Sequence, residues 1–428
     1  MQGTRASRVR WKILALLVGF SFVSYLQRMN ISVAAAFMMP ELDLSEQQMG
    51  WVFSSFMIGY TACQIPAGWI GDRFGAWRIL WGAAFFWGIF TLLSGWVPGL
   101  LVPGGLAALV SLLVLRFLLG VAEAPTYPVS ARVVANWFPS NQRAFPLALL
   151  IGGLSIGSAF TPPVISWLMV TVGWRNAFYV ASGFAFLIAV SYRWYATERP
   201  EGHPSVTSGE LAIISQGGEE TTVSKPTAAN PWLLFRNRNV FLLSMSYFCY
   251  GYVFYIFVFW LFLYLIDVRG FTLLESGFFT SLPFIVGGIA APVGGYMTDR
   301  LSIRIGRRWG RRWMGLTGMT LSGIALLIGA TTGHAGLAMV SLSFCFGFGE
   351  LTEGAYWSSI VDVSGRYAGS ASGVMNMWTN LGGVICTPLV PLLVGWFGWP
   401  FALGSAAPVS WIAGLLWLGI RSDETFEG

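Results

Sequence analysis

The sequence predicts an all-α membrane protein with twelve transmembrane helices in two pseudo-symmetric six-helix bundles. Its 428 residues are 55% hydrophobic and only 10% charged, whereas a soluble chain has about 25% charged residues. Apolar segments of about 20 residues, long enough to cross a bilayer, recur along the whole chain. A short charged motif also occurs at matching places in the two halves, which indicates an internal duplication.

The first six helices are expected to form an N-terminal bundle over residues 1–196. A polar segment, 197–238, is too polar to span a membrane and too short for a domain, so we expect a cytoplasmic linker there. The remaining residues, 239–428, are expected to form the C-terminal bundle. The twelve helices are expected near residues 11–38, 47–70, 79–97, 105–135, 144–170, 174–196, 239–266, 273–298, 313–331, 336–361, 369–395 and 399–420.

The basic residues predict the orientation of these helices. Cytoplasmic loops are rich in Lys and Arg, and the 25 basic residues divide 21 to 2 between the two sides, with Arg28 and Arg116 inside helices. Both termini are therefore predicted to be cytoplasmic. The net charge of +6 is explained by this topology, so no nucleic-acid partner is expected.

The repeated motif follows the second helix of each half. The first copy reads AGWIGDRFGAWR and the second reads GGYMTDRLSIRIGRR. Both resemble the loop signature of the major facilitator superfamily, and this resemblance implies the major facilitator fold for the whole chain. The matching residues of the first copy are Gly68, Asp72, Arg73, Gly75 and, one position displaced, Arg78; those of the second are Gly295, Asp299 and Arg300.

Two interpretations of these loops remain open. Asp72 and Arg73 are expected at a helix end near the cytoplasm, where a charged pair can bind a helix terminus and close one face of a transporter. The alternative is a basic turn that only sets the topology. Under either interpretation the loops do not bind the substrate.

Five ionisable residues fall inside predicted spanning helices, where they are costly and usually functional. Arg116 and Glu123 are seven residues apart and share one helix face, with a bend expected at Pro125 and Pro128. Arg116 is predicted to hold an anionic substrate and Glu123 to carry a proton, so that substrate and proton act through the same arginine. The alternative is a permanent buried ion-pair network. The other three are Arg28, Glu350 and Glu353.

The segments SYLQRMNIS, RFLLGVAEA and NMWTNLGG resemble the anion:cation symporter family, which includes bacterial sugar-acid transporters and vesicular glutamate transporters. The resemblance implies an organic-anion site and a bacterial inner-membrane location. It also implies that Asn376 and Asn380 contact substrate hydroxyls. The residues that match the family's site in the first half are Tyr25, Arg28, Tyr60, Arg116 and Glu123.

One departure from that family concerns proton coupling. Its sugar-acid members usually have an Asp before the helix 1 arginine, but this chain has Gln27, which does not titrate. Coupling then rests on Glu123, on Glu350 and Glu353, or is lost. Glu350 and Glu353 share one side of their helix, and two adjacent carboxylates repel, so one is expected to hold a proton near neutral pH. A helix-packing hydrogen bond of a protonated Glu is the alternative.

The seventh predicted helix is crowded with aromatic residues, and one face with Tyr247, Tyr250 or Tyr255 is expected to line the cavity. None of the three is distinguished by sequence alone.

The sequence therefore predicts a secondary active transporter of a small organic anion, a proton symporter that works by alternating access. An anion uniporter or exchanger is the alternative, because of Gln27. A membrane-embedded enzyme or a sensor would need a catalytic motif or a soluble domain, and neither a metal-ligand cluster nor a Walker A motif occurs. The expected partners are the anion, protons and the bilayer; sodium stays an alternative ion, and a monomer without cofactors or metals is expected.

Overall fold

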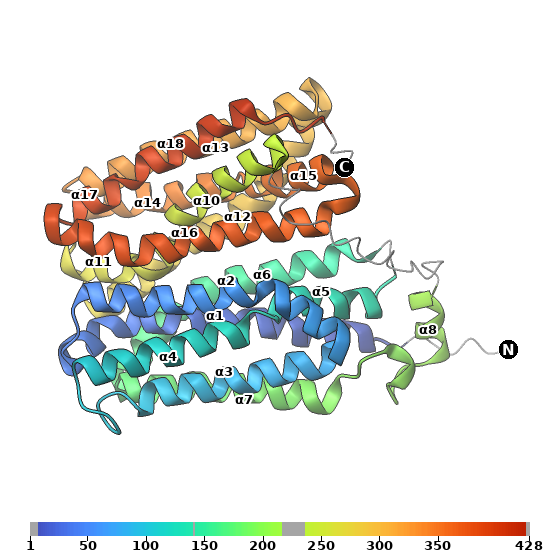
Figure 1. Cartoon of the computed structure of the whole chain (residues 1–428), viewed down its shortest axis with the longest axis horizontal. Helices are drawn as coiled ribbons and strands as arrows, with labels where there is room; N and C mark the ends of the chain where they lie inside the picture. Colours follow the sequence, from blue (N-terminus) through green and yellow to red (C-terminus); the bar gives the residue numbers. More distant parts are fainter. Residues whose placement is uncertain (1–6, 140–141, 216–235, 425–428) are drawn as a thin grey trace.

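The computed structural model describes residues 7–139, 142–215 and 236–424, and this part of the chain is almost entirely helical (Figure 1). Two bundles lie one above the other, and both chain ends lie toward the same end of the molecule. The N-terminal bundle contains α1 (Val9–Leu42), α2 (Glu46–Phe74), α3 (Ala76–Trp96), α4 (Leu106–Glu123), α5 (Thr126–Trp137), α6 (Ala144–Val172) and α7 (Trp174–Tyr195).

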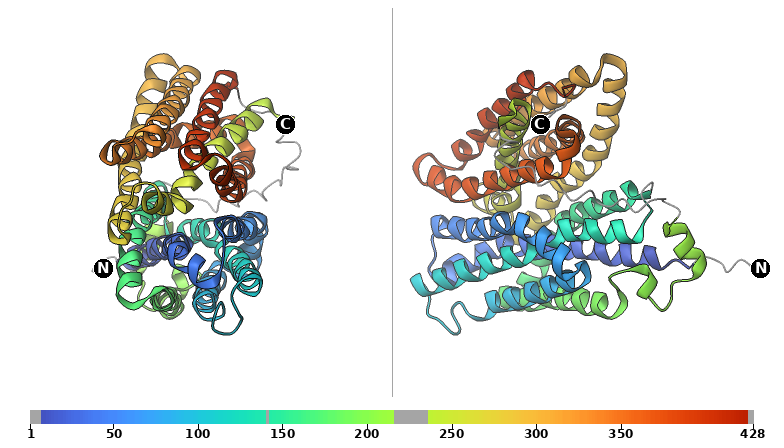
Figure 2. Two further views of the ribbon diagram at one scale, coloured as in Figure 1. Left: turned by 90° about the vertical axis from the view of Figure 1, so that its left-hand side faces the viewer. Right: turned by 45° about the vertical axis from the view of Figure 1, so that its right-hand side comes forward.

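The C-terminal bundle lies above the first in both views of Figure 2. Its elements are α10 (Arg238–Phe259), α11 (Leu261–Asp267), α12 (Leu273–Ile305), α13 (Arg307–Thr331), α14 (Ala335–Glu350), α15 (Glu353–Ser364), α16 (Ala368–Phe397), α17 (Trp399–Gly404) and α18 (Ala406–Leu416). Single-turn helices lie at Pro200–Gly202, Gly365–Tyr367 and Trp417–Gly419. The two bundles are in contact through α12 with α6 and α16 with α2.

Several of these elements are two parts of one broken spanning helix. The helix of α4 and α5 breaks at Ala124 and Pro125, where the sequence predicted a bend, because proline cannot donate a backbone hydrogen bond. The pairs α10/α11, α14/α15 and α17/α18 are also separated by only one residue or two, at Trp260, at Leu351 and Thr352, and at Ser405, without a proline at the break itself. Counted with these pairs joined, the described part of the chain has six spanning helices in each half. The predicted fold class is confirmed.

Eleven helical segments of the described chain are long and apolar enough to cross a membrane. The helix α2 is not among them, although its 29 residues are sufficient in length. Polar residues such as Ser54, Ser55 and Gln64 interrupt its apolar sequence, and α2 packs between α4 and α16, where it faces protein on both sides. A helix in that place needs less apolar surface than one that faces lipid.

The two halves meet at the end of the molecule that lies away from the chain termini. Gln47 donates to the carbonyl oxygen of Pro388 at 3.0 Å, and Ser54 donates to that of Val384 at 2.9 Å. Phe53 stacks on Phe259 with ring centres 5.0 Å apart. Contacts between the halves continue to the middle of the molecule, where Asn380 of α16 meets Gln64 of α2. This end of the molecule is therefore closed.

The predicted linker begins with described structure that contacts the first bundle. A short helix, α8 (Ser208–Ser215), lies beside the start of α1 (Figure 1). Its buried Glu210 accepts hydrogen bonds from the backbone of Val9 at 3.1 Å and of Arg10 at 3.0 Å. Residues 216–235 lie outside the described residues, so the domain boundaries near 196 and 238 stay a prediction.

Candidate functional site

A buried ion pair lies in the middle of the N-terminal bundle. The Nη2 atom of Arg28, in α1, is 2.7 Å from Oε1 of Glu123, the last residue of α4. Neither side chain is more than 2% exposed. Two charges are expensive to remove from water even as a pair, so this pair must be held by its surroundings.

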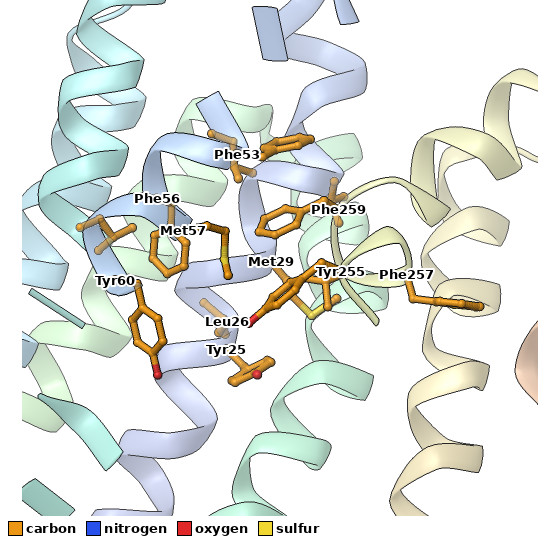
Figure 3. Packing of buried hydrophobic residues seen from close by; sticks show 14 of the residues in the cluster. Tyr25, Leu26, Met29, Phe53, Phe56, Met57, Tyr60, Tyr255, Phe257 and Phe259 are labelled. Carbon is orange, nitrogen blue, oxygen red and sulfur yellow. The ribbon is translucent and has the colours of Figure 1, made fainter. Parts of the chain in front are cut away.

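Aromatic rings surround the guanidinium of Arg28. Its Cζ atom lies 4.5 Å from the ring centre of Tyr60, 4.7 Å from that of Tyr25 and 5.2 Å from that of Phe56. Such cation–π contacts stabilise a cation by about 2 kcal/mol each where water is excluded. Figure 3 shows Tyr25, Tyr60 and Tyr255, from α1, α2 and α10, converging on one region between these helices.

Arg116 makes contacts of a different kind from those predicted. Its Nη1 and Nη2 atoms donate to the backbone oxygens of Gln27 at 3.2 Å and of Arg28 at 3.1 Å. Among the described residues, the ion pair found for Glu123 is with Arg28. The arginine that pairs with Glu123 is therefore Arg28, not Arg116 of the same helix. Sequence spacing missed this because a contact within one helix follows from spacing, whereas a contact between α1 and α4 does not.

Several polar atoms at this site are buried without a hydrogen-bond partner among the described residues. They are Oε2 of Glu123, Nε of Arg28, Nε of Arg116 and Oε1 of Gln27. The Nε2 atom of the Gln27 side chain donates a hydrogen bond to the backbone oxygen of Ala181 at 2.6 Å. Buried polar groups are normally paired, so this group of atoms indicates a place where a polar ligand or water completes the hydrogen bonds.

The C-terminal bundle contributes Asn380 to the same central region. Its Oδ1 accepts from the hydroxyl of Tyr255 at 2.7 Å, and its Nδ2 donates to Gln64 at 3.3 Å and to the backbone oxygen of Asn376 at 2.9 Å. The sequence named Asn376 and Asn380 but did not separate Tyr255 from its aromatic neighbours. Only the hydrogen bond to Asn380, across α10 and α16, distinguishes it.

Glu350 and Glu353 lie in the C-terminal bundle, one at the end of α14 and the other at the start of α15. Tyr250 donates to Glu350 at 2.7 Å, and Tyr247 donates to Glu353 at 2.9 Å. The indole of Trp357 also donates to Glu353 at 2.7 Å. Neither carboxyl group has a basic partner within salt-bridge distance among the described residues, so hydrogen bonds from aromatic side chains hold this pair.

The first signature loop lies between α2 and α3. Gly75 has a φ of +92°, a conformation that side chains disfavour. The carboxylate of Glu198 accepts from the next two backbone nitrogens, at 3.0 and 2.8 Å, and so binds the start of α3. Arg73 and Arg78 are exposed, while the burial of Gly68 and the side chain of Asp72 lie outside what the structure describes. Glu198 was not predicted, because it is distant in sequence.

The second loop differs from the first. Asp299 and Arg300 are exposed, and the guanidinium of Arg300 lies over the ring of Tyr296 at 5.1 Å. The ion pairs at this end of the C-terminal bundle use another carboxylate, Asp362 of α15, which is 2.6 Å from Arg311 and 3.7 Å from Arg307. The gating role predicted for both loops stays a prediction.

Comparison with known proteins identifies the family to which this chain belongs. A family model described as Major Facilitator Superfamily matches residues 17–305 and 302–427. A Cupriavidus necator protein named "probable sulfoacetate transporter" is 33% identical over 93% of this chain and 91% of its own length. A Bacillus subtilis protein named "probable galactarate/D-glucarate transporter" is 33% identical over 90% and 86%. An Escherichia coli D-galactonate transporter is 29% identical over 99% and 98%.

Two solved structures share the fold at 16% sequence identity. A bacterial homologue of the human lysosomal transporter Spinster, in an inward-facing and unoccupied conformation, superposes with a TM-score of 0.79 over 100% of both chains. A D-xylose–proton symporter superposes with a TM-score of 0.79 over 97% of this chain and 99% of its own.

Proposed function

This chain belongs to the major facilitator superfamily, and on that premise we propose that it carries a small organic anion across the membrane by proton-coupled symport. The predicted resemblance to the superfamily's transporters of sugar acids and other organic anions is confirmed, and the chain is a multi-pass membrane transporter rather than an enzyme. We further propose a bacterial inner-membrane location, with both termini in the cytoplasm, as the distribution of basic residues predicts.

The observation that carries the proposal is the ion pair of Arg28 with Glu123, 2.7 Å apart and buried. In the proposed cycle a substrate carboxylate replaces Glu123 at the guanidinium of Arg28. The two carboxylates compete because a planar guanidinium binds a carboxylate through two parallel hydrogen bonds. Glu123, left buried without its cation, takes up a proton. Binding of the anion and binding of the proton are then linked through one arginine.

The remaining site residues have proposed roles that follow from their places. Tyr25 and Tyr60 flank the guanidinium of Arg28, and Asn380 with Tyr255 offers hydrogen-bond partners from the opposite bundle. Asn376 lies one helical turn before Asn380, whose Nδ2 donates to its backbone oxygen, and we propose that its side chain also contacts the substrate. We assign Arg116 to positioning, because it holds the backbone of α1 at Gln27 and Arg28.

The bundles are proposed to rock about this midplane site. With the halves in contact at the end away from the termini, the structure would face the cytoplasm under the proposed orientation. Glu350 and Glu353 are proposed as a second proton-binding pair in the other bundle, supported by their two tyrosine donors.

The test is uptake into proteoliposomes, with and without an inward proton gradient, of the acids named for the relatives: sulfoacetate, galactarate, glucarate and galactonate. We expect accumulation of at least one acid only with the gradient. The Glu123→Gln variant keeps the shape of the side chain, so it is expected to lose accumulation yet keep exchange of labelled for unlabelled substrate. Accumulation by Glu123→Gln at the wild-type level would contradict the assignment of the proton.

A second candidate function is a uniporter or an anion exchanger without proton coupling. It is favoured by Gln27, whose side chain cannot titrate and donates a hydrogen bond to the backbone oxygen of Ala181. This candidate predicts equal uptake with and without the proton gradient, and faster uptake when a second anion is loaded inside the vesicles.

A further inference from the structure

The buried charges of the N-terminal bundle do not balance. Arg28 and Arg116 are both almost completely buried, at 2% and 0% exposure, and the carboxylate that lies with them is Glu123. Each guanidinium carbon lies 5.2 Å from the ring centre of Phe56, so the two are at most about 10.4 Å apart. With Glu123 ionised, the group carries one excess positive charge; with Glu123 protonated, it carries two.

The second arginine is held by the backbone of α1. Arg116 uses two of its nitrogens on the backbone oxygens of α1, at 3.2 and 3.1 Å, and its side chain is not exposed. Its charge nevertheless acts through the protein, because buried charges are only weakly screened. At a separation of about 10 Å and an effective dielectric constant of about 20, one unit charge changes the affinity for an ion by more than about tenfold.

We propose that the carrier selects organic dianions over monoanions of the same size, and that Gln27 and Arg116 determine this preference without touching the substrate. This inference rests on the proposed function, in which the substrate displaces Glu123 and Glu123 takes a proton. A dianion then balances both arginines, whereas a monoanion leaves one buried positive charge uncompensated. Burial of an uncompensated charge is strongly unfavourable.

Gln27 determines the net charge of this buried group because it contacts Arg116 and has a neutral side chain. Its backbone oxygen accepts from Arg116, its side chain is fully buried, and its Oε1 atom has no partner among the described residues. A carboxylate in its place would remove the excess positive charge. Oε2 of Glu123 and Nε of Arg28 are likewise buried without a partner among the described residues, so a bound anion or water can complete their hydrogen bonds.

The experiment measures dissociation constants of the purified full chain at pH 7.5 for paired acids that differ by one charge. The pairs are galactarate with galactonate, sulfoacetate with its carboxamide, and succinate with succinamate. For the pair that binds, we expect the dianion to bind at least tenfold more tightly. Equal or tighter binding of the monoanion would overturn the inference while leaving the proposed function intact, provided that binding still depends on Arg28. Failure of every acid to bind would instead count against the proposed function.

Two pairs of variants isolate the charge from the shape. Gln27→Asp adds a carboxylate, and Gln27→Asn is its neutral control of equal size. We expect the preference for the dianion to fall at least tenfold in the first and to persist in the second. Arg116→Gln, which removes the charge, is expected to lower the preference as well, while Arg116→Lys keeps it. A preference that is the same in Gln27→Asp and Gln27→Asn would refute the role of this position.

Discussion

The two bundles place a glutamate at the same point of a broken helix but give it different partners. Glu123 ends α4 in the first half, and Glu350 ends α14 in the second. In each half a residue of the first helix contacts that glutamate at 2.7 Å: Arg28 from α1 and Tyr250 from α10. Duplication therefore kept the helix break and the carboxyl group, while the partner changed from a cation to a neutral donor.

This difference indicates how the two bundles can divide anion binding and proton binding between them. A permanent cation beside a glutamate attracts anions and can exchange one carboxylate for another. A tyrosine beside a glutamate donates a hydrogen bond without adding charge, which suits a carboxyl group that binds a proton or only packs. The anion site is thus expected on the N-terminal side of the centre, with the C-terminal bundle supplying neutral polar contacts such as Asn380 and Tyr255.

The largest effect is expected from a change in the N-terminal bundle, where Glu123 is paired with a cation. Arg28→Met keeps the length of the side chain and removes its charge, so Glu123 loses its partner and the anion its proposed ligand. Truncating one partner of a buried, hydrogen-bonded charge pair costs about 2–5 kcal/mol of binding free energy, which corresponds to at least about 30-fold in affinity. Binding measured by ligand-induced thermal stabilisation should disappear, and Arg28→Lys should restore part of it. Near-normal binding by Arg28→Met would remove Arg28 from the site.

The next effect concerns the contact between the halves. A Cβ atom on Gly50 would lie 2.6 Å from the carbonyl oxygen of Thr387, so Gly50→Ala should force α2 and α16 apart at the closed end. We expect transport to fall about tenfold, in line with about 1–3 kcal/mol for overpacking. Labelling of a cysteine introduced at that end should increase. The matched control is Gly82→Ala, where no atom lies within 4 Å and no change is expected.

A smaller effect is expected from a change in the C-terminal bundle, where Glu350 is paired with a neutral tyrosine. Glu350→Gln retains an oxygen that accepts the hydrogen bond from Tyr250, so binding of the anion should change less than about threefold. Comparison with Glu123→Gln in the same uptake assay shows which half carries the coupled proton. If Glu350→Gln alone abolished accumulation driven by the proton gradient, coupling would belong to the C-terminal bundle.

The smallest effect concerns the attachment of α8. Glu210 accepts from two backbone nitrogens at the start of α1, and loss of such a capping carboxylate costs about 1 kcal/mol. Glu210→Ala should lower the melting temperature slightly, with little change in substrate affinity. Glu201→Ala, an exposed residue nearby, should leave the melting temperature unchanged. A large loss of affinity in Glu210→Ala would show instead that α8 controls the position of Arg28.

The sequence by itself determined the fold class and the list of intramembrane charges. Both follow from local chemistry: a run of apolar residues predicts a spanning helix wherever it occurs, and a charge in such a run is rare enough to indicate a site. The break after Glu123 was predictable for the same reason, because Pro125 cannot continue the hydrogen bonding of α4. Arg28 and Glu123 are indicated as intramembrane charges, while Tyr25, Tyr60 and Asn380 are indicated by the resemblance of their segments to the anion:cation symporter family.

Only the tertiary structure decided which charge meets which. Spacing placed Arg116 and Glu123 on one face of a helix. The arrangement of the bundle instead lets Arg28 of α1 reach Glu123 of α4, while the Arg116 side chain donates to the backbone of α1. The bond of Tyr255 to Asn380, the cap of Glu198 on α3 and the pairing of Asp362 with Arg311 also join distant segments. The physical reason is that partners on different helices depend on how those helices pack, and one-dimensional spacing carries no information about that packing.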